Sequence, residues 1–186
     1  MRTLAALGAL ELSSVGIGYL AEDQMLKAAD VELLIARTIC SGKYLVIVAG
    51  SVSDVEAAVS SGLAAAGESV IDVLVLPRVH EAVLPALGQS VALSAAQAQA
   101  LGVLESYSGV SILAAADAAA KAANVILFHI HVAMALGGKG LCLFTGSVAD
   151  CEAAVRAGAD KVRERGLLVS EIVIAGPRPE LFREYL

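Results

Sequence analysis

The stretch GSVSDVEAAV at residues 50–59 returns almost unchanged as GSVADCEAAV at residues 146–155. Two further stretches repeat in the same order on its N-terminal side. They are ALGALE (6–11) with ALGVLE (100–105), and KAADV (27–31) with KAANV (121–125). A repeat of this length is typical of a whole small domain that has been duplicated, not of a short solenoid unit.

The repeat predicts two domains, at residues 1–88 and 100–186, joined by a linker at 89–99 rich in Ala, Gln and Ser. Each copy should run strand, helix, strand, turn, strand, helix, strand. In the first copy the second helix is expected to begin at Ser53, because Glu56 stands three residues later as in a capping box. The expected strands of that copy are Ala6–Ser13, Val31–Ile39, Tyr44–Ala49 and Val70–Leu76, and its first helix is Tyr19–Ala29. Each copy is therefore expected to be an α+β domain with its helices on one face of the sheet.

The composition is unusually apolar, with 17% charged residues and a mean hydropathy of +0.76. The longest uncharged stretch, Ala82–Leu104, contains Pro, Gly and Gln, so we expect no membrane span. The N-terminus does not have the pattern of a secretory signal, and three scattered cysteines fit a reducing cytoplasm better than a disulfide framework. The excess apolar surface favours an oligomer, and the net charge of −6 argues against binding nucleic acid.

Two local patterns allow a ligand and also have simpler interpretations. Gly16–Ala21 fits the Gly-x-Gly-x-x-Ala dinucleotide fingerprint, but no ribose-binding acid ends the next strand and the second copy lacks the pattern. His129 and His131 alternate along one strand and could share a metal, although no acid or cysteine nearby in the sequence completes a ligand set. The simpler interpretation is that these histidines are polar residues on the outer face of a half-buried strand or at a subunit contact. No catalytic constellation is visible, so an enzyme is not expected.

The copies differ at the turn between their two central strands. The first has Cys40-Ser41-Gly42-Lys43 where the second has Leu136-Gly137-Gly138-Lys139. A turn places a thiol at the surface, where it can acquire thiolate character. One cysteine cannot hold a cluster, but three copies around a three-fold axis would supply three thiolates, one fewer than Fe–S clusters normally take.

These motifs closely resemble bacterial microcompartment shell proteins of the tandem-domain kind. The resemblance covers almost the whole chain twice, through the repeated stretches above and the Arg-Pro tail at Pro177-Arg178-Pro179. It implies two tandem ferredoxin-like domains, with three chains forming a pseudo-hexameric homotrimer. Such trimers tile edge to edge with other shell proteins around metabolic enzymes in the cytoplasm.

The resemblance also implies roles for particular residues. The residues implied to make contacts at the tile edge are Lys27, Lys121, Arg78 and Arg178. The two lysines also have a simpler interpretation, which is compensation of the helix dipole. The residues implied to line the central pore are Cys40, Ser41, Gly42, Leu136, Gly137 and Gly138. Within the family, the loop from Thr38 to Lys43 looks most like the iron–sulfur-carrying type of propanediol-using compartments, where this cysteine binds one [4Fe–4S] cluster per trimer.

Three functions follow as hypotheses. The first is a shell tile whose pore cluster moves electrons or an intact cluster across the shell, with encapsulated redox enzymes as possible partners. The second is a tile with a plain metabolite-conducting pore and no cluster. The third is a ferredoxin-like regulatory module that binds a small ligand without tiling.

Overall fold

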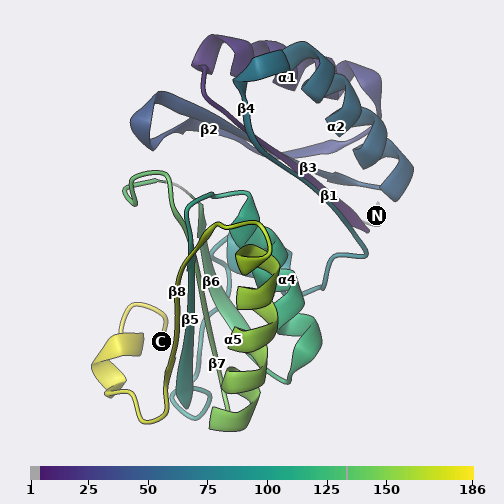
Figure 1. The fold of residues 1–186 in the computed structure, drawn as a ribbon. Coiled ribbons are helices and arrows are strands. Elements are labelled where there is room, and N and C mark those ends of the chain that lie inside the picture. The colour runs from purple at the N-terminus through teal and green to yellow at the C-terminus, as the bar shows by residue number, and fades with distance from the viewer. Residues whose placement is uncertain (1–4, 133) are drawn as a thin grey trace. The chain divides into compact units, whose positions relative to one another are not determined.

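The protein was analysed as a computed structural model that describes residues 5–132 and 134–186. The chain forms two compact units, each built around its own four-stranded sheet (Figure 1). One unit contains residues 5–79 together with the segment 134–138, and the other contains 80–132 and 139–186. The domain boundaries expected from the sequence, at 88 and 100, remain a prediction.

The first unit has helices on one face of an antiparallel sheet. Its strands follow the order β2-β3-β1-β4, and α1 and α2 lie together on one side (Figure 1). The elements are β1 (Ala6–Leu12), α1 (Val15–Ala28), β2 (Glu32–Ile39), the tight turn η1 (Cys40–Gly42), β3 (Lys43–Gly50), α2 (Val52–Ala66), the short turn η2 (Gly67–Ser69) and β4 (Val70–Pro77). Apolar side chains of β1, β3, α1 and α2 form the core between sheet and helices.

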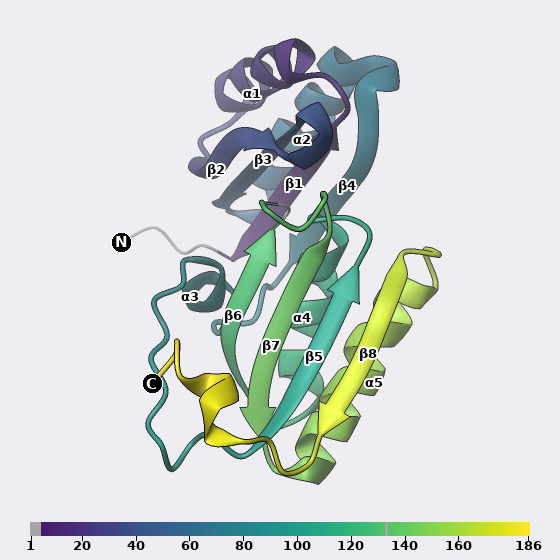
Figure 2. The same ribbon diagram turned by 90° about the vertical axis from the view of Figure 1, so that its left-hand side faces the viewer.

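The second unit repeats this arrangement with the strand order β6-β7-β5-β8. Figure 2 shows this sheet with α4 and α5 behind it. The elements are α3 (Val83–Leu87), β5 (Ala100–Ser106), α4 (Ser111–Ala122), β6 (Ile126–Val132), β7 (Gly140–Gly146), α5 (Val148–Arg163), β8 (Leu168–Ile174) and the C-terminal turn η3 (Pro179–Phe182). The βαββαβ order with this antiparallel sheet is the ferredoxin-like topology, so the expected α+β fold is confirmed in both copies.

The outer face of the second sheet, the face without helices, carries a smaller apolar cluster. Leu93 of the linker and Phe182 of the C-terminal turn are buried there against Leu101 and Phe128. The amide of Leu93 also donates to the carbonyl oxygen of Tyr185 at 2.7 Å. The linker and the C-terminal segment are therefore attached to the second unit by packing and by backbone pairing.

Two helix starts differ from the sequence expectation. Helix α1 begins one turn earlier than Tyr19, because the Ser14 hydroxyl accepts from the amide of Ile17 and caps Val15–Ala28. The prediction that Ser53 caps α2 is wrong. Ser51 has the extended backbone of a cap (φ −67°, ψ 160°) and accepts from the amide of Asp54, whereas Ser53 lies inside the helix. Among the described residues, no helix is both long and apolar enough to cross a bilayer.

Candidate functional site: the two sheet-end turns

The candidate site is built from the turns that close the β2–β3 hairpin in the first copy and the β6–β7 hairpin in the second. The β2–β3 turn reverses over Cys40–Gly42, with Ser41 and Gly42 both in the left-handed region (φ 67° and 73°). The β6–β7 turn uses the same device, with Ala135, Gly137 and Gly138 at φ 58°, 64° and 87°. Glycine adopts this conformation without steric cost, which explains why both copies keep glycine at this point.

The structure brings the two turns together in the first unit. The amide of Ala135 donates to Sγ of Cys40 at 3.1 Å. A Cβ atom placed on Gly138 would lie 3.4 Å from Nζ of Lys43 and 3.9 Å from the carbonyl oxygen of Cys40. All six residues expected to line a pore are therefore near one another, although their role as a pore lining remains a prediction.

Backbone amides surround the thiol of Cys40. Partial burial alone would raise its pKa, but hydrogen bonds from the amides of Ala135, Gly137, Gly138 and Leu136 together hold the pKa below that of an ordinary thiol. Consecutive amides that point at one atom form an anion-binding concavity. This turn therefore favours a thiolate, the form of cysteine that binds metals.

The other two cysteines have the opposite environment. Cys142 and Cys151 have no exposed surface, and burial raises the pKa of both, that of Cys151 to about 11. Cys151 occupies the position of Val55 in the first copy, which is equally buried. These two thiols act as small apolar side chains of the core.

Each turn is anchored by an ion pair that the sequence analysis did not single out. Nζ of Lys43 lies 2.8 Å from Oε1 of Glu11, and Nζ of Lys139 lies 2.5 Å from Oε1 of Glu105. Glu11 is fully buried, whereas the Glu105 side chain keeps 23% of its surface exposed and also accepts from the hydroxyl of Ser170. The signal was present in the repeat, since both stretches ALGALE and ALGVLE place a glutamate in an apolar strand.

The expected edge residues lie away from the turns. Lys27 and Lys121 stand in the last turns of α1 and α4, and each pairs at 2.6 Å with the aspartate four residues earlier. Arg78 follows β4 with φ 53°, and Arg178 follows β8 with most of its side chain exposed. Both lysines are placed as dipole compensation requires, and their contacts with neighbouring tiles stay a prediction.

The second glycine of the dinucleotide-like pattern has a packing explanation. Gly16 lies within α1, where a Cβ atom would meet nothing within 4 Å. A Cβ atom on Gly18 would come within 2.4 Å of Cγ of Tyr44, so this glycine allows the helix to approach the Tyr44 ring. The Tyr44 hydroxyl then donates to Glu22 at 2.7 Å. Close packing of helix on strand therefore accounts for Gly18 without a bound nucleotide, whereas no contact requires glycine at position 16.

Comparison with known proteins identifies the class of this chain. The family model for the BMC domain matches residues 6–79 and 100–177, so it matches the chain twice and covers most of its length. The chain therefore belongs to the bacterial microcompartment (BMC) shell protein family, in the form with two tandem domains.

Individual relatives agree with this assignment. The chain is 41% identical over 179 residues to the bacterial microcompartment shell protein PduT of Citrobacter freundii, with 96% of both chains covered. It is 32% identical to the carboxysome assembly protein CcmO of Synechococcus elongatus, over 97% of this chain and 68% of that protein. The crystal structure of a microcompartments protein from Desulfitobacterium hafniense is 42% identical and superposes with a TM-score of 0.88, covering 96% of this chain and 98% of that one.

Proposed function

We propose that three copies of this chain form a pseudo-hexameric shell tile in which the three Cys40 turns meet and ligate one [4Fe–4S] cluster. The observation that carries the proposal is the environment of Cys40. Its thiol lies on a turn, is partly exposed, and has its pKa lowered by backbone amides. Thiolate is the usual protein ligand of iron–sulfur clusters.

The remaining chemistry of the turn suits an anionic group. A cluster held by thiolates carries negative charge, and backbone N–H groups directed at its sulfurs raise the reduction potential. The amides of residues 135–138 surround Cys40, and the ammonium of Lys43 lies next to the same segment. When bound, the cluster supplies one-electron transfer, and three thiolates per trimer leave one iron open to another ligand.

The tandem arrangement explains how one cysteine per chain can suffice. In a tile of six identical domains, a pore residue would appear six times. In a trimer of tandem domains, the Cys40 turn appears three times and alternates with the Leu136 turn. The proposed tile is a structural component of a shell in the cytoplasm and not an enzyme, and redox enzymes inside the shell are its proposed electron partners.

The test is to purify the chain without oxygen and to count iron and sulfide per three chains, with the visible absorption spectrum as a second readout. We expect about four irons for each three chains. Cys40→Ser should abolish bound iron while size-exclusion chromatography with light scattering still shows a trimer. Cys151→Val is the matched control, because the first copy carries Val55 there, and it should retain the cluster.

Two results would contradict the proposal. A colourless protein after anaerobic cluster reconstitution would exclude the cluster and leave a tile with a plain pore. Unchanged iron in Cys40→Ser would place the iron elsewhere. Tiling is tested separately by electron microscopy, where Lys27→Ala or Lys121→Ala should disrupt sheets or tubes of purified protein, and a protein that never forms them would favour a regulatory module.

A further inference from the structure

The outer face of the second sheet carries two stacked imidazoles. His129 and His131 of β6 point to the same side, with ring centroids 5.7 Å apart and ring planes inclined by 24°. Metal–nitrogen bonds to imidazole are about 2.0–2.1 Å long and lie in the plane of the ring, so the centroid spacing lets both side chains reach one ion once each ring turns a nitrogen toward it. The two residues are fixed by the strand ladder, where they pair with Leu143 and Leu141 of β7.

The repeat shows that this face does not need histidine. The ladder places Ile35 and Arg37 of β2 opposite Ile47 and Leu45 of β3, which are the counterparts of Leu143 and Leu141. Both copies even share the irregularity of register just before this pair. Ile35 and Arg37 are thus the structural equivalents of His129 and His131. The same strand geometry forms with no imidazole, so the two histidines are not required by the sheet.

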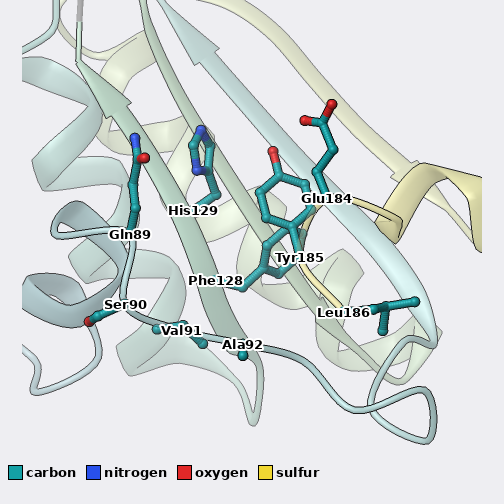
Figure 3. A pocket seen from close by; sticks show the side chains of 9 residues that line it. All are labelled: Gln89, Ser90, Val91, Ala92, Phe128, His129, Glu184, Tyr185 and Leu186. Atoms are coloured by element: carbon teal, nitrogen blue, oxygen red, sulfur yellow. The ribbon is translucent and has the colours of Figure 1, made fainter.

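His129 also lines a cavity of about 430 Å³ at the outer face (Figure 3). The cavity is bordered by the linker through Gln89, and by Phe128, Glu184 and Tyr185. The ring of Tyr185 lies with its centroid 5.3 Å from that of His129, and the polar ends of Gln89, His129, Tyr185 and Glu184 extend to the same side (Figure 3). An ion at His129 would therefore have room for further ligands of its own.

The charge beside this site favours a bound cation. Glu184 lines the same cavity as His129. A histidine must be neutral to bind a metal, and the carboxylate of Glu184 attracts a cation. Within the described residues, no group of three or more His, Cys, Asp or Glu side chains is arranged around a metal position, so the site offers two protein ligands.

We propose that His129 and His131 together bind one divalent transition-metal ion that prefers nitrogen ligands, such as Ni²⁺, Cu²⁺ or Zn²⁺, with coordination positions left open toward the cavity. Two protein ligands and open positions are the arrangement of an exchangeable site, since structural sites are closed by four. The site is separate from the Cys40 turn and does not depend on the proposed cluster.

The test is a calorimetric titration of the Cys40→Ser chain with Ni²⁺, because this background removes the exposed thiol. We expect saturable binding of one ion per chain, and electron paramagnetic resonance of the Cu²⁺ form should show two coordinated nitrogens. Binding should be lost in His129→Ile, which restores the residue of the first copy, and in His131→Gln, which removes the ligand without adding charge.

The third histidine provides the control. Nδ1 of His80 accepts from the amide of Ala82, and His80→Asn keeps an acceptor there while removing the imidazole. This variant should bind Ni²⁺ as the parent does. The proposal is overturned if no saturable binding occurs, or if binding survives in either His129→Ile or His131→Gln. Loss of binding in His80→Asn with retention in the other two would move the site to His80.

Discussion

Replacing Lys43 by methionine should destabilise the protein far more than the equivalent Lys139→Met. Two unit charges at 2.8 Å attract by about 6 kcal/mol at an effective dielectric constant of about 20. Part of this attraction offsets the free-energy cost of removing the Glu11 carboxylate, which is fully buried, from water. Breaking such a buried pair by removing one partner costs about 3–5 kcal/mol. Asp72, also buried, stands opposite Glu11 in the ladder, so losing the ammonium leaves two neighbouring carboxylates less compensated.

The second pair lies in a wetter environment. The side chains of Lys139 and Glu105 keep 36% and 23% of their surface exposed, so water replaces much of what the ammonium supplied. Opposite Glu105 stands Ser170, whose hydroxyl donates to the carboxylate at 3.1 Å and remains after the substitution. We therefore expect Lys139→Met to cost only about 1 kcal/mol.

Urea denaturation followed by circular dichroism measures the free energy of unfolding of both variants. Hydrogen exchange should show the loss of protection in Lys43→Met concentrated in β1 and β3. The double variant Glu11→Gln, Lys43→Met should recover much of the stability, because it removes the buried charge. Equal losses in the two single variants, or no recovery in the double variant, would refute the argument from burial.

Two further predictions concern the turn thiol and the first helix. In the reduced protein without a cluster, iodoacetamide should alkylate Cys40 with a pH midpoint below that of an ordinary thiol, because amide hydrogen bonds favour its thiolate. Cys151 should stay unreactive below its pKa of about 11. A midpoint for Cys40 at the ordinary thiol value would exclude the effect of the amides. In urea denaturation, Gly18→Ala should destabilise the chain by about 1–3 kcal/mol, because the new Cβ atom overlaps Tyr44. Gly16→Ala should stabilise it by about 0.5–1 kcal/mol, because its Cβ atom meets nothing within 4 Å. Equal effects of the two substitutions would contradict the packing explanation.

The repeat made the fold predictable from the sequence. Each element of one copy was supported by its counterpart, and the turn glycines marked the hairpins in both. The helix starts were less predictable, because Ser51 and Ser53 both have the chemistry of a cap and only the backbone conformation distinguishes them.

The candidate site was only partly visible. The sequence singled out Cys40 because it interrupts a repeat, but not the amides of residues 135–138 that lower its pKa. Those contacts join residues about a hundred positions apart in the chain, and backbone groups leave no mark in a side-chain pattern. The relation between His129 and Tyr185 was hidden for the same reason, since it depends on where the C-terminal segment returns.

The two glutamate–lysine pairs have a consequence for how such a turn can change. Each pair joins the two strands at the base of its hairpin, so Cys40 and Ser41 can vary while Gly42 keeps the turn and the strands keep their register. The sequence of the turn can thus change while the pair of strands that carries it stays constant. After gene duplication, one of the two turns can acquire new residues while the other keeps its own. A single chain then presents two turns of different chemistry on the same fold.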